Sequence, residues 1–258
     1  MIWAAAAAIC VSSILSTLPT PLYPIYEQTF HFSQIMLTVI YAVYVVGTVT
    51  AMFFFGRLSD QVGRRLVVLI SLGIAAASAL VFMFAQATWW LFPARILSGL
   101  GIALVSGATT AWIVESEPGA DKAAGTQIAI GANFLGLATG PLMGGVLAQY
   151  APSPLRLSYL MFVVLLFPLA LVIWKTQETV REARSLDEAS IAPRLGIPRE
   201  MFGVFVPAAV GAFATFAVLG FYTALVPTLL ENPCKTRTTQ RPVALLANCL
   251  WPVQSQSR

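Results

Sequence analysis

A charged segment bounded by glycines is the part of this sequence best suited to chemistry. It reads Gly56-Arg-Leu-Ser-Asp60-Gln-Val-Gly63-Arg64-Arg65, and it separates two apolar runs, Ile35 to Phe55 and Leu66 to Ala85, each long enough to cross a bilayer. A carboxylate and several guanidinium groups this close together can form ion pairs or bind the charged end of another helix. Because charges are costly inside the hydrocarbon, we expect this segment in water at a membrane face.

Arg95 is a second candidate, because it is a charge deep within a predicted membrane span. An arginine at mid-membrane costs about 2.5–3.5 kcal/mol, so a sequence keeps one where it faces a cavity or a partner. The alternative is that Arg95 extends to the outer interface, since it lies only five residues beyond Trp90.

Composition indicates an integral membrane protein. Of the 258 residues, 58% are hydrophobic and 10% are charged, whereas soluble domains carry about 25% charged residues. Three cysteines and one histidine form no CxxC, HExxH or clustered pattern, so we expect no metal site, no cofactor, no catalytic residue and no enzyme activity. The net charge of +4 is interpreted as an excess of basic residues on the cytoplasmic side rather than as a nucleic-acid-binding surface.

Seven apolar runs are predicted to span the membrane, which makes the fold class an all-α polytopic membrane protein. The runs are Ile2–Tyr23, Ser33–Phe55, Leu66–Ala85, Trp90–Val114, Ala124–Tyr150, Leu157–Trp174 and Phe202–Leu230. One set of connecting loops holds nine basic residues and the other holds only Arg156, which predicts a cytoplasmic N-terminus. Trp112 and Trp174 are expected at the inner interface, where indoles concentrate.

Glycines recur at every fourth residue along the fifth predicted span. Gly136, Gly140 and Gly144 share one face, and Pro141 and Gly145 each follow one of them directly. Small residues let two helix backbones approach closely, and proline removes one helical hydrogen bond. The pattern therefore predicts a close helix contact.

Together these segments resemble the major facilitator superfamily of transporters. The segment from Gly56 to Arg65 meets every fixed position of the Gly-x-Leu-x-Asp-x-x-Gly-Arg-Arg/Lys pattern between the second and third helices of that family. Arg95 to Ala103 resembles the fourth-helix pattern Arg-x-x-x-Gly-x-Gly-x-Ala. Gly136 to Gly145 resembles the fifth-helix motif of drug–proton exchangers, although the longer motif has glycine where this chain has Gln127. A general helix-packing face stays open as the alternative for that span.

The resemblance implies a domain organisation and roles for particular residues. It implies an N-terminal six-helix facilitator bundle at 1–175, a cytoplasmic linker at 176–200, a seventh helix at 201–231 and a non-membrane tail at 232–258. The residues with an implied role in transport or gating are Gly56, Asp60, Gly63, Arg64, Arg65 and Arg95, and we add Glu115 because it could pair with Arg64 or Arg65. A pair of that kind could equally be a solvated surface contact. The family has two six-helix halves, so we expect a truncated form.

The predicted function is secondary active efflux of small organic molecules, coupled to protons and driven by alternating access. The expected partners are an amphipathic drug or a sugar as substrate, a proton as coupling ion, and the lipid bilayer. We expect the protein in the plasma membrane, which is the inner membrane in a bacterium. One alternative is a truncated remnant that inserts without transporting. A seven-helix light-driven pump is disfavoured, because it needs a lysine in its last helix and none lies between Lys175 and Lys235.

Overall fold

The computed structural model describes residues 1–116 and 122–178, together with scattered helical residues between 202 and 218. In chain order, the elements are α1 (Ile2–Thr17), the 3-10 turn η1 (Thr20–Leu22), α2 (Tyr23–Phe30), α3 (Gln34–Phe55), α4 (Leu58–Val62), α5 (Arg64–Met83), the 3-10 turn η2 (Thr88–Trp90), α6 (Leu91–Ser116), α7 (Lys122–Tyr150) and α8 (Pro154–Lys175). No strand occurs in this described part, which confirms the all-α fold class.

Six stretches of the described residues are long and apolar enough to cross a membrane. They correspond to α1 with α2, α3, α5, η2 with α6, α7 and α8. The chain is therefore a multi-pass membrane protein. The predicted seventh span, the linker beyond residue 178 and the tail fall outside the described residues, apart from the scattered helical positions.

The first predicted span is longer than expected and is interrupted. We placed its end at Tyr23, but the chain is helical again from Tyr23 to Phe30 after a break at Leu18 to Leu22. Pro19 and Pro21 lie within the break, and neither can donate a backbone hydrogen bond to continue the α-helix. The chain passes through the tighter turn η1 instead.

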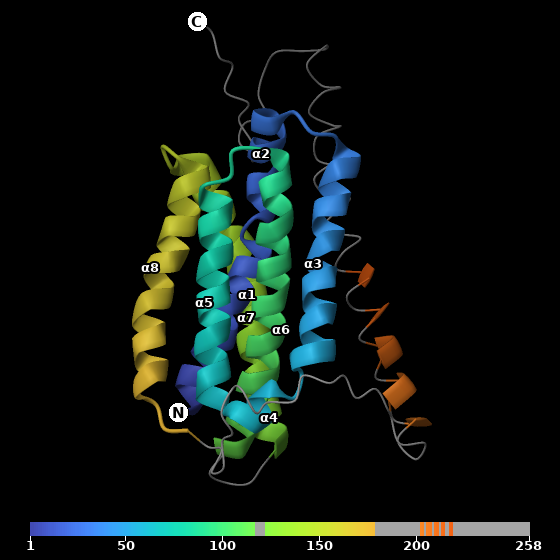
Figure 1. Cartoon of the computed structure of the whole chain (residues 1–258), viewed down its shortest axis with the longest axis vertical. Coiled ribbons are helices and arrows are strands. Elements are labelled where there is room, and N and C mark those ends of the chain that lie inside the picture. Colours follow the sequence, from blue (N-terminus) through green and yellow to red (C-terminus); the bar gives the residue numbers. More distant parts are fainter. Residues whose placement is uncertain are drawn as a thin grey trace, which may run out of the picture. The chain divides into compact units, whose positions relative to one another are not determined.

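The chain divides into two compact units, Met1–Arg194 and Leu195–Arg258. Within the first unit, α6 packs most extensively against α5 and α3, and α1 packs most extensively against α7 and next against α6. In Figure 1 these long helices run side by side along the vertical axis, with α4 and the N-terminus at one end and α2 at the other. Helices α1 and α6 therefore form the centre of the bundle.

The outer faces of the bundle are apolar. Large side chains such as Met52 on α3, Leu142 on α7 and Phe167 on α8 are about 70% exposed (68%, 70% and 68%). Soluble proteins rarely expose apolar faces this extensive, whereas a bilayer stabilises them. Trp174 is exposed at the end of α8. Trp112 is buried in the hydrophobic core near the end of α6, so its side chain does not contact lipid, and its place at the inner interface stays a prediction.

Candidate functional site

Arg64 is the centre of a charged cluster at the end of the bundle that carries α4. It is the first residue of α5, and its side chain is only 8% exposed. One guanidinium nitrogen, Nη1, donates to Ser59 Oγ at 2.7 Å and also to Asp60 Oδ1. The other, Nη2, donates to Glu115 Oε1 at 2.7 Å. One arginine thus joins α4, α5 and the end of α6.

The two acids of this cluster differ from Arg64 in exposure. The side chain of Asp60 is 54% exposed and that of Glu115 is 42% exposed, although both contact the same buried guanidinium. Asp60 lies on α4 and Arg64 begins α5, so the two side chains meet because the turn at Gly63 brings the two helices together. The structure therefore brings together Asp60, Arg64 and Glu115, while leaving part of each carboxylate accessible to a further group.

Gly63 connects α4 to α5 in a conformation that favours glycine. Its φ is 116° and its ψ is 145°, which strains any residue with a Cβ atom. Gly56 closes α3 at the other end of the segment and is exposed, with an ordinary helical φ of −57°. The segment is thus more than the tight turn we expected, because it contains the five-residue helix α4.

Arg95 lies in the interior, near the start of α6, with 1% of its surface exposed. Its guanidinium carbon is 5.1 Å from the ring centre of Tyr23, 5.3 Å from Tyr41, 5.9 Å from Tyr44 and 5.8 Å from Phe82. Aromatic faces stabilise a cation at such distances. This burial excludes the alternative in which the side chain extends to the outer interface.

The hydrogen bonds of Arg95 go to neutral groups. Nε donates to Tyr23 Oη, and Nη1 donates to the backbone oxygen of Ser16 at 2.9 Å. Nη2 is buried and has no hydrogen-bond partner among the described residues, and no carboxylate there forms an ion pair with Arg95. A buried charge with an unsatisfied donor is costly, so this group has unused capacity to bind an acceptor.

The glycine face of α7 lies against α1. A side chain at Gly136 would meet the backbone oxygen of Cys10, one at Gly140 would meet Thr17 Oγ1, and one at Gly144 would lie 2.6 Å from the backbone oxygen of Leu18. All three glycines are buried. Gly145, by contrast, has open space beside it, so the last position of the motif does not take part in this contact.

Pro141 explains a polar contact within the same interface. Its ring nitrogen has no hydrogen, so the carbonyl of Leu137, four residues earlier, loses its usual helical donor. Thr17 Oγ1 of α1 donates to that carbonyl at 3.1 Å. Gly140 leaves the room that the threonine needs, since a Cβ atom there would collide with Thr17 Oγ1. The sequence pattern predicted the close approach, but not the side chain that completes it.

Sequence reasoning anticipated the pair of Glu115 with Arg64 but missed the other partners of the two arginines. Ser59, Tyr23 and Ser16 were given no role as partners, nor was Thr17 in the contact between α1 and α7. Glu178, which lies in the predicted cytoplasmic linker at 176–200, accepts hydrogen bonds from the start of α5. The signal that could have found the partners of Arg95 was aromatic, because Tyr23, Tyr41 and Tyr44 all lie on the first two predicted spans.

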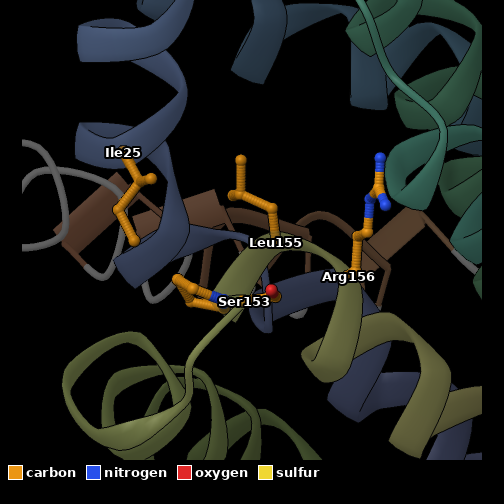
Figure 2. Close-up of a pocket in the computed structure, with 5 residues that line it drawn as sticks. Ile25, Ser153, Leu155 and Arg156 are labelled. Carbon is orange, nitrogen blue, oxygen red and sulfur yellow. The ribbon is translucent and has the colours of Figure 1, made fainter.

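A shallow, open depression of about 250 Å³ lies at the opposite end of the bundle from α4, beside the start of α8. Figure 2 shows Ile25 from α2 facing Ser153, Leu155 and Arg156 across it. None of the residues with an implied role in gating or transport lines it. Its position and open shape make it a surface feature rather than the substrate site.

Comparison with known proteins gives consistent matches. The sequence profile of the Major Facilitator Superfamily matches residues 5–233. The class B tetracycline resistance protein of Escherichia coli is 34% identical over 128 residues, which are 49% of this chain and 31% of that protein. The methyl viologen resistance protein SmvA of Salmonella typhimurium is 30% identical over 114 residues, which are 43% and 22% of the two chains.

A longer stretch matches a transporter from animals. The human vesicular acetylcholine transporter is 28% identical over 182 residues, which are 69% of this chain and 33% of that protein. The chain therefore matches about a third or less of the length of each of these relatives.

Proposed function

The chain belongs to the Major Facilitator Superfamily, and on that basis we propose that it is part of a transporter that exports small organic molecules in exchange for protons. The observation that carries this proposal is the similarity to proteins named for resistance to tetracycline and to methyl viologen. The glycine motif of α7, which resembles that of drug–proton exchangers, supports the direction of transport.

The proposed mechanism is alternating access, in which two helical bundles rock against each other around a central site. The described bundle would be one of the two. In this mechanism Asp60, half-exposed beside Arg64, would meet the positive N-terminal end of a helix in the other bundle. Such a contact contributes about 0.3–1 kcal/mol when exposed and up to about 2 kcal/mol when partly buried, enough to bias one conformation while leaving it reversible.

Arg95 is the proposed coupling residue. Its Nη2 is unsatisfied but buried, so a carboxylate from the second bundle or from the substrate would bind it only after the surrounding helices open during the transport cycle. Protonation of the acid removes the attraction and leaves Arg95 with its tyrosine partners. This alternation would link the movement of a proton to the movement of a substrate, as the predicted role of the fourth-helix motif requires.

We further propose that α4 and the N-terminus face the cytoplasm of a bacterial cell and that the protein lies in the inner membrane. The asymmetry of basic residues supports this orientation. A membrane-impermeant thiol reagent tests it with cysteine at position 57, in a protein without its natural cysteines. Arg57 is exposed, whereas Ser59 in the same segment is buried. Labelling from outside intact cells would show that the orientation is the opposite of the one proposed.

The transport proposal is tested in a host that lacks its own efflux pumps. The chain would be expressed alone and together with the C-terminal six-helix half of the class B tetracycline resistance protein. We expect protonophore-sensitive resistance to tetracycline, and extrusion of a fluorescent dye, only when the second bundle is present. Efflux by this chain alone would contradict the two-bundle mechanism. Normal insertion without efflux in either case would contradict the transport proposal.

A further inference from the structure

The residues that follow α8 return to the beginning of α5. Glu178 lies three residues beyond the end of α8. Its Oε1 accepts a hydrogen bond from the backbone N–H of Arg64 at 2.9 Å, and its Oε2 accepts one from the backbone N–H of Arg65 at 2.9 Å. The first N–H groups of a helix have no partner within the helix and carry partial positive charge. Both oxygens of one carboxylate therefore cap α5.

A second contact runs in the opposite direction. Arg65 Nη1 is 3.4 Å from the backbone oxygen of Trp174 and 3.3 Å from that of Thr176, both at the end of α8. The last carbonyl groups of a helix carry partial negative charge and are satisfied by basic side chains. Each of the two helix ends is thus capped by a charged residue that belongs to the other segment.

Gly63 makes room for this arrangement. A Cβ atom at position 63 would lie 2.7 Å from Glu178 Oε2 and 3.0 Å from its carboxyl carbon. The glycine is therefore needed for its positive φ and also for the approach of the carboxylate. This second requirement involves a residue more than a hundred positions away in the sequence.

We propose that Glu178 and Arg65 form a reciprocal cap that fastens the segment after α8 to the start of α5, and that Glu178 is a positioning residue for Arg64. The carboxylate fixes the backbone of the residue whose side chain holds Ser59, Asp60 and Glu115 together. Arg65 acts on α8 in this arrangement, in place of the gating role implied by the family resemblance. The proposal rests on the proposed function only in treating Arg64 as a gating residue, and the cap itself is tested without transport.

The test is limited trypsin digestion of the purified 258-residue chain, with the rate of cleavage after Lys175 followed by mass spectrometry. Lys175 is the last residue of α8, and the cap holds the carbonyls on both sides of it. We expect Glu178→Gln and Arg65→Ala to speed this cleavage about three- to tenfold, because proteolysis reports local opening. Glu178→Asp, one methylene shorter, should fall between Glu178→Gln and the parent protein.

Three control variants separate the cap from general effects. Glu27→Gln and Arg57→Ala remove the same charges elsewhere, and both should leave the rate after Lys175 unchanged. Thr17→Val weakens the contact between α1 and α7 and should raise cleavage at all sites together, without selecting Lys175. A rate for Glu178→Gln equal to that for Glu27→Gln would overturn the proposal. So would an increase spread evenly over all sites.

Discussion

The two buried arginines of the bundle, Arg64 and Arg95, occupy opposite electrostatic environments. Arg64 is buried against two partly exposed carboxylates and a serine hydroxyl. Arg95 is more deeply buried, and it faces tyrosine rings, one tyrosine oxygen and one backbone carbonyl. The charge of Arg64 is therefore balanced within the bundle, whereas the charge of Arg95 is not balanced by any described residue.

This difference predicts that the two arginines contribute to stability with opposite sign. A balanced pair near water can hold elements together, and its loss leaves acids that water still solvates. A buried charge without an opposite charge beside it is costly, because its desolvation is not offset by an ion pair. If Arg95 lowers the stability of the bundle, as its unsatisfied donor predicts, the proposed role in transport gives a reason for its presence.

Arg95→Met should show the largest effect. In a protein that transports, with its second bundle present, we expect coupled efflux to fall about 100-fold, equivalent to about 3 kcal/mol. The free energy of unfolding of the 258-residue chain in detergent should stay the same or rise by about 1–4 kcal/mol, because a buried charge is removed. Drug resistance and thermal unfolding measure the two quantities. Full efflux with lower stability would show that Arg95 is a structural residue.

Tyr23→Phe should destabilise the bundle by about 1–3 kcal/mol. It removes the oxygen that accepts from Arg95 Nε, so a second donor of the guanidinium becomes unsatisfied. Tyr41→Phe is the matched control, since the ring stays over the guanidinium and we expect a smaller loss. Denaturant titration monitored by tryptophan fluorescence measures both. Equal losses for the two variants would contradict the importance of the Tyr23 hydrogen bond.

Arg64→Met should destabilise by about 1–2 kcal/mol, opposite in sign to Arg95→Met. The substitution removes the hydrogen bonds to Ser59, Asp60 and Glu115, while the released carboxylates remain partly solvated. The same unfolding measurement tests it. A gain in stability would show that the cluster at α4 is as costly as the Arg95 site, and the comparison would fail.

Asp60→Asn should have the smallest effect, about 0.5 kcal/mol or less. Its side chain is more than half exposed, and exposed ion pairs contribute little. The effect should shrink further in 1 M salt, where the Debye length is about 3 Å, whereas the effect of Tyr23→Phe should not change. Unfolding at low and high salt provides the measurement. A salt-independent loss would place the Asp60 pair in a buried environment.

The class of the molecule, its membrane spans and its family motifs could all be predicted from the sequence alone. Six of the predicted spans correspond to helical stretches, because an apolar run must satisfy its backbone hydrogen bonds internally and a helix does so locally. The family was recognised from motifs, because short patterns such as Gly56 to Arg65 are contiguous in the chain. The break after α1 was not predicted, because the apolar run continues through Pro19 and Pro21.

The packing of the helices, rather than any local pattern, sets which groups meet. Arg95 lies among Tyr23, Tyr41 and Phe82 because α1, α2, α3, α5 and α6 converge there, and no local pattern encodes that convergence. Glu178 reaches the start of α5 across more than a hundred residues, and Thr17 reaches the carbonyl freed by Pro141 across a helix interface. The hydrophobic pattern and the positions of helix-breaking residues are local properties of the sequence. The partner of a buried polar group is set by packing between helices.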